Sequence, residues 1–396
     1  MNDQTLYADS VAMHRAAGGK LGVAPKVPLD TARDLALAYS PGVAGPCQAI
    51  AADPTQSLTL TMRGNTVAVL TDGSAVLGLG NIGPAAAMPV MEGKAALFKA
   101  FADVDAVPIC ADVSSDDGLI AVAKAIAPGF GGINLEDIAA PRCFVVEDAL
   151  QGLGIPVFHD DQHGTAIALL AALTNGAKVV GKPIESLRVV INGAGAAGSA
   201  IAKILRCVGH DPAECLGVAD VVICDSRGIV SPDRDDLNAF KRGLLGYTNP
   251  AGRSGDLRAA LRGADVLIGV SKGNLIEARD VRTMAADAII LAMANPTPEI
   301  MPDEAARGGA AGVGTGRSDL PNQVNNVLVF PGLFRGALNA RAQRITGPMK
   351  LAAVRALAAA VETPTAERIL PDPLDKSVAE RVAAAVREAA VTPTGV

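Results

Sequence analysis

Two adjacent pairs of carboxylates are the residues of this sequence whose types and spacing most directly suggest chemistry. Glu136 and Asp137 follow the run FGGINL, and Asp160 and Asp161 come shortly after the apolar run IPVF. Both pairs are therefore predicted at the ends of buried strands, the edge of a sheet at which α/β proteins bind ligands. Convergent carboxylates without neighbouring cysteine ligands or paired histidines favour a hard, oxygen-liganded ion such as Mg²⁺ or Mn²⁺ over zinc.

A purely structural interpretation of these carboxylates also fits the sequence. The first pair could occupy the first turn of a helix, where acidic residues are favoured, and the second pair could cap the helix that follows Gly164. His159 and His163 flank the second pair and could act as ligands or bases. Solvated loop histidines are common, so neither histidine is given a role.

The fingerprint G-x-G-x-x-G of dinucleotide-binding loops occurs twice, at residues 78–83 and 193–198. The second copy follows the strand-like run RVVIN and opens the helical run SAIAKIL, and Asp225 closes the next strand, which is the context that this motif needs. Asp225 comes 32 residues after Gly193, a long spacing that an inserted loop around 209–218 explains. The residues predicted to lie against the pyrophosphate are Gly193, Gly195, Ala196, Ala197 and Gly198.

The first copy is predicted to be a structural turn beside a substrate pocket. Pro84 and Pro89 should break up the segment that follows it, and no second strand ends in an acidic residue at the right distance. The second copy is therefore the favoured cofactor site. Within that site Asp225 favours the ribose diol of NAD, whereas Arg227 could accept the 2′-phosphate of NADP, so we expect use of both cofactors with a slight preference for NADP.

The elements that must position these residues alternate β-branched runs with Ala-rich helical stretches. Strands are predicted at 66–70, 107–110, 188–191 and 221–224, and helices at 93–101, 166–173, 349–361 and 377–391. This alternation predicts an α/β protein of two domains. We expect an N-terminal α/β substrate domain over 1–158 and a C-terminal Rossmann-type domain, a doubly wound parallel sheet, over 159–396.

Bulk properties exclude several classes of function. A net charge of −6 and 3% aromatic residues leave no footprint for nucleic acid, and no apolar run approaches the length of a membrane span. The N-terminal residues lack the basic flank and apolar core of a secretory signal, so a cytoplasmic location is expected. Six cysteines without a C-x-x-C pair argue against a zinc ribbon or a disulfide framework.

Six longer motifs resemble those of the short bacterial malic enzymes, in the order that this family has them. They are YSPGVAGPC (39–47), TDGSAVLGLGNIGPAAAMPVMEGKAALFKAF (71–101), FGGINLEDI (130–138), FHDDQHGTA (158–166), ANPTPEI (294–300) and VNNVLVFPG (324–332), which extend over most of residues 14–340. The resemblance implies oxidative decarboxylation of malate to pyruvate with NAD or NADP and Mg²⁺ or Mn²⁺. It also implies decarboxylation of oxaloacetate and assembly into at least a homodimer.

The same resemblance implies a role for individual residues. Tyr39 matches the general acid and Lys94 the general base, whereas without the resemblance each could be an ordinary surface residue. Asp160 matches a carboxylate beside the lysine. The matching metal ligands are Glu136, Asp137 and Asp161, and the matching amides, which contact substrate and the nicotinamide, are Asn295 and Asn326.

One departure from the family concerns a residue that binds the substrate. Larger members carry an arginine in the TDG loop where this chain has Ala75, so the group that binds the distal carboxylate of the substrate is not identified.

Two other functions are alternatives to malate decarboxylation. A 2-hydroxy-acid dehydrogenase without decarboxylation would need no metal, and a non-catalytic dinucleotide sensor would not need the tyrosine, lysine and carboxylates together.

Overall fold

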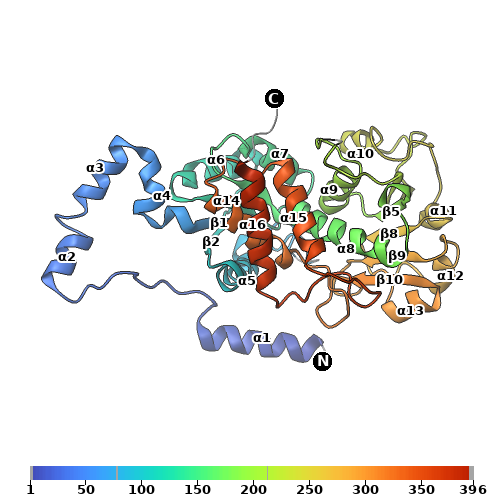
Figure 1. The fold of residues 1–396 in the computed structure, drawn as a ribbon, viewed down its shortest axis with the longest axis horizontal. Helices are drawn as coiled ribbons and strands as arrows, with labels where there is room; N and C mark the ends of the chain where they lie inside the picture. The colour runs from blue at the N-terminus through green and yellow to red at the C-terminus, as the bar shows by residue number, and fades with distance from the viewer. Residues whose placement is uncertain (1–2, 77–78, 212, 392–396) are drawn as a thin grey trace.

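Two β-sheets lie side by side in the computed structural model, and helices cover both faces of each (Figure 1). The structure describes residues 3–76, 79–211 and 213–391. The predicted α/β class with two sheet domains is thereby confirmed. Among the described residues, none of the helices combines the length and apolar character needed to cross a bilayer.

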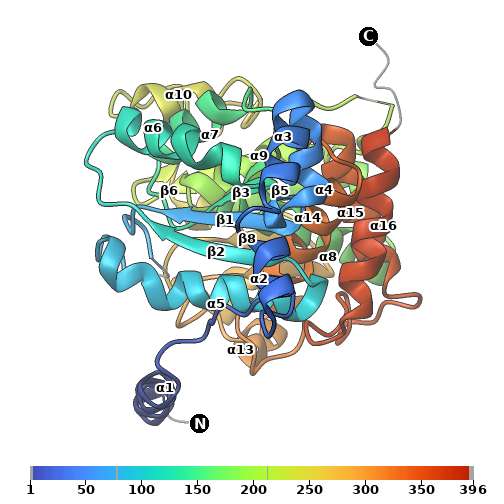
Figure 2. The ribbon, with the colours of Figure 1, turned by 90° about the vertical axis from the view of Figure 1, so that its left-hand side faces the viewer.

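The first sheet has four parallel strands in the order β2-β1-β3-β4. Alternate residues of its central strand point to opposite faces, as the pleat requires. Val67 and Val69 pack towards α5, whereas Ala68 and Leu70 pack towards α6 and α7, the two layers seen on either side of the sheet in Figure 2. The elements of this part are β1 (Thr66–Thr71), α5 (Pro84–Ala102), β2 (Asp105–Cys110), α6 (Asp116–Ile126), η3 (Ala127–Gly129), β3 (Gly132–Leu135), α7 (Arg142–Leu150) and β4 (Val157–His159).

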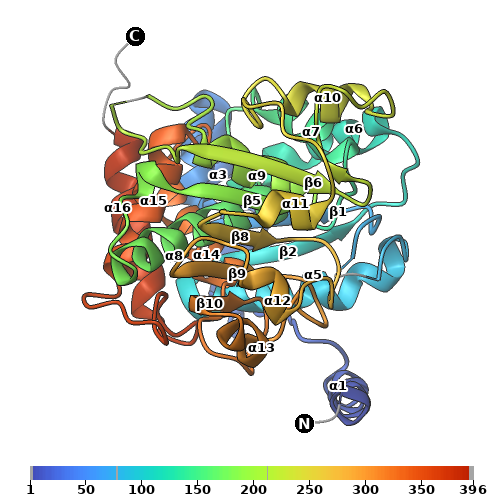
Figure 3. The same ribbon diagram turned by 90° about the vertical axis from the view of Figure 1, so that its right-hand side faces the viewer.

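The second sheet has six strands in the order β10-β9-β8-β5-β6-β7, seen face-on in Figure 3. All neighbours are parallel except the two-residue edge strand β7, so this is the doubly wound order of dinucleotide-binding domains with a shortened third strand. Its elements are β5 (Arg188–Asn192), α9 (Ala196–Leu205), β6 (Asp220–Asp225), β7 (Gly228–Ile229), α10 (Ala239–Leu244), α11 (Leu257–Leu261), β8 (Val266–Gly269), α12 (Ala278–Val281), β9 (Ala288–Ala292), α13 (Pro302–Arg307) and β10 (Ala310–Thr315).

Helices that precede and follow the second sheet join the two halves of the molecule. Phe330 and Phe334 reach back to Phe98 on α5, with ring centroids 4.7 and 5.4 Å away, so one continuous core runs between the sheets. These connecting elements are η4 (Asp160–Gly164), α8 (Thr165–Val179), η5 (Ile184–Ser186), η6 (Asn326–Leu328), α14 (Phe330–Asn339), α15 (Gly347–Ala359) and α16 (Ser377–Val391).

Residues 3–52 form an arm that extends away from the body (Figure 1). The arm touches the body through Lys20, which binds Glu92 and the Pro89 carbonyl on α5, and through Lys26, which pairs with Asp105 at the start of β2. The arm contains α1 (Asp3–Ala17), α2 (Ala32–Ala38) and α3 (Ala44–Ala52), and none of these helices has a buried residue. It joins the body through η1 (Pro54–Gln56), α4 (Ser57–Leu60) and η2 (Met62–Asn65). The arm therefore makes no core of its own within one chain.

The segment after the first glycine loop departs from the sequence prediction. Instead of being broken by its prolines, it forms the 19-residue helix α5. Pro84 stands at the first position, where the missing N–H costs nothing, and Pro89 lies inside the helix. An internal proline costs about 3 kcal/mol, but burial of Met91 and Phe98 contributes about 1.5–3 kcal/mol each, so packing outweighs the proline.

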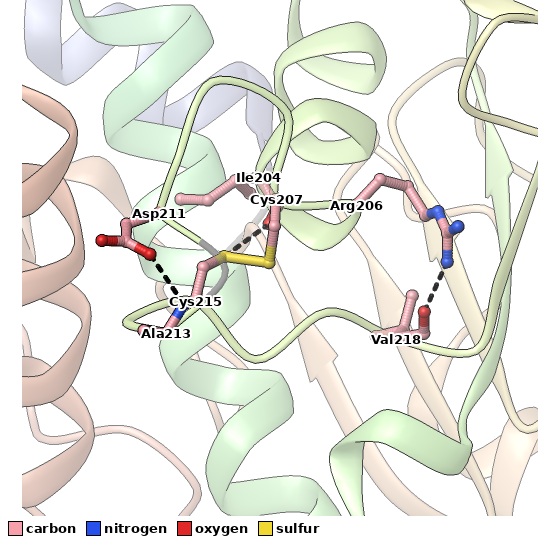
Figure 4. Close-up of a disulfide and its surroundings, with 7 residues drawn as sticks. All are labelled: Ile204, Arg206, Cys207, Asp211, Ala213, Cys215 and Val218. Atoms are coloured by element: carbon pink, nitrogen blue, oxygen red, sulfur yellow. Dashed lines mark hydrogen bonds between the residues drawn. A yellow bond between two sulfur atoms is a disulfide. The ribbon is translucent and has the colours of Figure 1, made fainter.

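A disulfide joins Cys207 to Cys215 in the inserted loop between α9 and β6 (Figure 4). The loop folds back on the end of α9, where the Arg206 guanidinium donates to the carbonyl of Val218 at 2.6 Å. The cysteine spacing argued against a disulfide framework and did not predict this single bond, because the pairing depends on this return of the chain and has no spacing motif. The remaining thiols, those of Cys47, Cys110, Cys143 and Cys224, are free.

Candidate active site

A buried lysine surrounded by carboxylates lies where β3 and β4 end. The Lys94 ammonium is 2.6 Å from Asp160 Oδ2 and 2.8 Å from Glu136 Oε1, and its side chain is 8% exposed. The ammonium also lies 4.2 Å from the centre of the Phe330 ring, a cation–π distance. Lysine is almost never buried without a partner, so this ion-pair cluster is a built feature of the fold.

Three carboxylates form a cluster of oxygen atoms beside the lysine. Oxygens of Glu136, Asp137 and Asp161 all lie within 4.8 Å of one another, and Asp161 Oδ2 accepts a 2.8 Å hydrogen bond from the Asp137 backbone N–H. Asn134 holds Glu136 from the other side, with its Nδ2 donating at 2.8 Å. Carboxylate oxygens gathered at this spacing, two of the three side chains buried, match the ligands that Mg²⁺ and Mn²⁺ prefer.

The electrostatics of the cluster show an excess of negative charge. Burial raises the pKa of Glu136 and of Asp160 to about 7, against the opposing effect of the lysine. Burial alone would lower the pKa of Lys94, but the neighbouring charges, chiefly Asp160 and Glu136, outweigh it and raise that pKa above its usual range. One lysine among four carboxylates leaves charge that a divalent cation would compensate, so the residues present fit such an ion.

The structural alternatives for the two carboxylate pairs do not hold. Glu136 and Asp137 follow β3 directly, in a loop that ends before α7 begins, so they are not a first helical turn. Asp160 and Asp161 lie in the π-helical turn η4, which leads into α8, but their side chains bind Lys94 and the Asp137 amide instead of capping α8.

Glu147 on α7 holds the turn that carries the second pair, and the sequence analysis missed it. One carboxylate oxygen accepts from the His159 backbone N–H at 3.3 Å, and the other from Gln162 Nε2 at 3.3 Å and lies 3.0 Å from His163 Nε2. The pairing with His163 lowers the pKa of Glu147 to about 2 although burial opposes this. A signal existed: Glu147 falls on the buried stripe of α7 formed by Cys143, Val146 and Leu150.

Two of the carboxylates, the second glycine loop and the two asparagines line one pocket of about 610 Å³. This pocket brings together seven of the residues singled out from the sequence, although they come from both sheet domains and from the segment after β10. They are Asp137, Asp161, Gly195, Ala196, Ala197, Asn295 and Asn326, with Ala75 on the same wall. No arginine or lysine lines this pocket among the described residues. The pocket wall therefore offers no substitute for the substrate-binding arginine that the resemblance led us to expect at the position of Ala75.

The second glycine loop has the geometry that its fingerprint predicts. Gly193 has a φ of 135°, which favours glycine, and a Cβ at Gly198 would lie 1.8 Å from the Gly193 carbonyl oxygen. A Cβ at Gly195 would meet nothing within 4 Å, so this residue faces open space at the start of α9. The first copy belongs to the first sheet domain, between β1 and α5, and its Gly78 lies outside the described residues.

A second pocket, of about 690 Å³, continues from the glycine loop to the end of β6. Gly195, Val270 and Ser271 line both pockets, so the two form one groove across the carboxyl ends of the second sheet. Asp225 and Arg227 line its far end. The groove has the length and the loop geometry to hold a dinucleotide, with one end at the carboxylates.

Tyr39 is the one proposed catalytic residue that the fold of a single chain leaves outside the site. It ends α2 on the arm, its side chain is 69% exposed, and it does not line the pocket at the carboxylates. The chain has only three tyrosines, and neither Tyr7 nor Tyr247 lines that pocket. The motif YSPGVAGPC identified Tyr39 as a candidate. The motif does not indicate whether the tyrosine side chain contacts its own chain or another subunit.

Comparison with known proteins gives a consistent result across the chain. Two family models match it: "Malic enzyme, N-terminal domain" over residues 18–119 and "Malic enzyme, NAD binding domain" over residues 162–391. The bifunctional malic/malolactic enzyme of Bacillus subtilis is 52% identical over 99% of this chain and 94% of its own length. The NADP-dependent malic enzyme of Halomonas elongata is 45% identical over 94% of this chain and 90% of its own length.

A solved structure matches the whole architecture. The crystal structure of the NAD-dependent malic enzyme from Thermotoga maritima superposes with a TM-score of 0.91 at 48% sequence identity, over 95% of this chain and 98% of that one. Relatives of similar identity to this chain are thus named as NAD-dependent in one case and as NADP-dependent in another.

Proposed function

The chain belongs to the malic enzyme family, and from this premise we propose how its residues carry out the oxidative decarboxylation of malate to pyruvate with NAD or NADP. The observation that carries the proposal is the buried Lys94, held between Glu136 and Asp160. Glu136 belongs to the carboxylate cluster whose other members, Asp137 and Asp161, line the pocket that the glycine loop also lines. Base, metal ligands and cofactor loop thus meet at one place.

Oxidation needs a base for the C2 hydroxyl proton while the C2 hydride passes to the nicotinamide. Lys94 is the group placed to take that proton, and Asp160 holds its ammonium at 2.6 Å. A lysine acts as a base only when neutral, so the carboxylate charges that raise its pKa must be offset during turnover. Asn295 and Asn326 line the same pocket and are placed to orient substrate and nicotinamide.

Decarboxylation breaks the C3–C4 bond and leaves an enol that must gain a proton at C3. A divalent cation held by Glu136, Asp137 and Asp161 would polarise the C2 oxygen and stabilise negative charge on it. Tyr39 is proposed to donate the proton to C3. The same residues would serve decarboxylation of oxaloacetate, which enters after the oxidation step.

Because Tyr39 lies outside its own chain's pocket, the proposal includes a homodimer in which each arm delivers Tyr39 to the partner subunit. Fourteen of the 23 large hydrophobic side chains that are exposed in the described residues lie between Leu6 and Met62. Monomeric proteins rarely expose so much apolar surface in one segment, and short helices without a buried face are not stable alone. A second copy supplies the missing surface, and the tyrosine completes its site.

A coupled assay tests the function. With malate, NAD or NADP and Mn²⁺, we expect absorbance at 340 nm to rise together with pyruvate, and EDTA to abolish turnover until Mn²⁺ is restored. Oxaloacetate as the only product would mean a simple dehydrogenase, and nucleotide binding without turnover would mean a sensor. Light scattering after gel filtration measures the molar mass in solution, which should be that of two chains.

Two coarser assignments belong to the same proposal. The domain division is proposed at 158/159, at the end of the first sheet and within its last strand, β4, and expression of the two halves would test it. A cytoplasmic location fits the four free thiols, one of them on the exposed Cys47, because a reducing compartment preserves thiols. The Cys207–Cys215 bond is the exception, and fractionation of cells would decide the location.

A further inference from the structure

We propose that Glu299 is a positioning residue for hydride transfer, because its carboxylate joins the loops after β8 and β9 and so fixes where Ser271 and Asn295 face the groove. Glu299 belongs to the motif ANPTPEI, in which the sequence analysis singled out only Asn295. It is fully buried and lines neither pocket of the groove, so it acts through the residues that it holds. The inference rests on the proposed function, because it assumes that malate passes a hydride to a nicotinamide beside the carboxylates.

The carboxylate of Glu299 bridges the carboxyl ends of two neighbouring strands. Oε1 accepts a 3.0 Å hydrogen bond from the Ser271 backbone N–H, and Oε2 accepts a 3.1 Å hydrogen bond from the Ala294 backbone N–H. The paired residues of β8 and β9 end at Gly269 and Ala292, so the two N–H groups lie beyond the last pair and need another acceptor. One side chain supplies that acceptor to both loops.

A glycine at the end of β8 leaves the space that this carboxylate occupies. A Cβ at Gly269 would lie 2.2 Å from the carboxyl carbon of Glu299 and 2.5 Å from each of its oxygens. The backbone of Glu299 holds the same loop a second time, because its carbonyl accepts from the N–H groups of Leu275 and Ile276 at 2.9 and 3.1 Å. The loops after β8 and β9 are therefore joined through this one residue.

The connection continues to the strand that carries the glycine loop. Asn192, the last residue of β5, donates from Nδ2 to Ser271 Oγ at 2.9 Å, and its carbonyl accepts from the Val270 N–H at 2.9 Å. Gly193 follows, and a Cβ on it would lie 2.7 Å from the Val270 carbonyl oxygen. Ser271 lines both pockets of the groove, and Asn295 lines the pocket at the carboxylates. Groups on three strand ends thus keep their relative places through Glu299 and Ser271.

Stability alone does not explain a carboxylate at this position. Burial raises the pKa of Glu299, and the groups that oppose this are backbone N–H donors, with no described side-chain cation among them. Burying a carboxylate without a cation is costly, and a neutral side chain would cost less. A neutral amide, however, has a single acceptor oxygen, whereas the two loops each present an N–H. The charge is therefore retained for the arrangement of the two loops.

Kinetics expressed per folded site separate positioning from a loss of fold. Glu299→Gln keeps the shape but turns an NH₂ group towards one of the two backbone N–H groups, so one loop loses its bond. We expect kcat with malate and NAD to fall roughly 10–100-fold per site that binds ADP-ribose in isothermal titration, the usual effect of losing a hydrogen bond to a charged group. The affinity for ADP-ribose, which lacks the nicotinamide, should stay within about twofold.

An isotope effect identifies the step that becomes slow. With malate deuterated at C2, the deuterium isotope effect on kcat should be larger in Glu299→Gln than in the wild-type protein. Displaced loops disturb the alignment of C2 with the nicotinamide, so hydride transfer then limits turnover more strongly. A variant that is merely less stable would have fewer ADP-ribose sites but the parental kcat and isotope effect at each site.

The matched control is Glu304→Gln, because Glu304 also accepts from a backbone N–H, that of Ala278 at 2.8 Å, and lines neither pocket. It should change neither kcat nor the isotope effect. The parental kcat and isotope effect per site in Glu299→Gln, or equal changes in the control, would overturn the positioning role.

A second variant decides the question if Glu299→Gln does not fold and binds no ADP-ribose. Asn192→Ala removes the hydrogen bond to Ser271, and it should lower kcat roughly two- to tenfold with the same increase in the isotope effect. No change in this variant would overturn the proposal. Pyruvate formation by the wild-type protein separates the two levels: without it the proposed function fails too, and with it an unaffected variant removes only the role of Glu299.

Discussion

The two halves of the proposed active site are built in opposite ways. The Lys94 centre lies in the body, where the lysine and its partners Glu136 and Asp160 are all less than a tenth exposed. Tyr39 lies on an arm without a buried residue in its helices and is 69% exposed. The proposed base and metal ligands are therefore preorganised within one chain, whereas the proposed acid would depend on assembly.

Under the proposed mechanism, this difference makes one step of the reaction depend on the folding of a single chain and another step depend on the association of two chains. In the proposed mechanism, oxidation of malate uses only groups that one folded chain holds in place, and protonation of the enol uses a tyrosine from a second chain. A fold that separates the two steps in this way would leave an unassembled chain unable to complete turnover.

Lys94→Ala should lower kcat/KM for malate by roughly 10²–10⁴-fold, the usual contribution of a positioned general base. The lysine is buried beside the carboxylates, so no neighbouring side chain can replace it. Lys99→Ala is the matched control, because Lys99 lies on the same helix but is 52% exposed and pairs with Asp103 and Asp105. A loss of similar size in the control would show that the effect comes from α5 and not from the base.

Glu147→Gln should weaken Mn²⁺ binding by roughly 10–100-fold, the usual cost of losing a group that orients metal ligands. Glu147 binds the turn from His159 to His163, and the shape of glutamine keeps the packing while the charge is lost. Asp148→Asn, the exposed neighbour on α7, is the control. Titration with Mn²⁺ should show the loss as an activity that is restored at higher metal concentration, and a loss that metal does not restore would contradict the positioning role.

Sequence reasoning located the body of the site far better than its surroundings. Strand ends before Glu136 and Asp160 and the glycine loop at 193–198 are local patterns, and the structure places them as those patterns indicate. The helix through Pro89, the ion pairs of Asp225 and the Cys207–Cys215 bond depend on residues distant in the chain or on how a loop returns. The exposure of Tyr39 is of the same kind, because no local pattern says whether a side chain meets its own fold or another.

Mixing two inactive variants tests the division between chains directly. If Tyr39 acts on the partner's site, a hybrid of Tyr39→Phe and Lys94→Ala subunits contains one site with both residues intact. Random exchange of subunits at equal amounts should then restore roughly a quarter of the parental activity, because half of the dimers are hybrids with one working site of two. The same mixture stays inactive if each chain uses its own tyrosine, since no chain then carries both residues.

The smallest expected effect concerns stability, and it should leave the division between body and arm untouched. The Cys207–Cys215 bond closes a loop of eight residues' separation at the end of α9, in the body and away from the arm. Closing a loop of this length stabilises a protein by about 2–3 kcal/mol through the unfolded state, which for a chain of 396 residues corresponds to a fall in Tm of roughly 2–4 °C when the bond is lost.

Replacing both cysteines of this bond by serine should therefore lower Tm in calorimetry without changing the molar mass in light scattering or kcat with malate. Dithiothreitol should lower the Tm of the parent to that of the variant and should not lower the variant further, so reduction serves as the internal control. Because the loop lies in the body, a change in dimerisation on its removal would mean that the contact between subunits extends beyond the arm. The acid would then depend on the body as well, and the contrast between a preorganised base and an assembled acid would be weaker than the exposure of Tyr39 indicates.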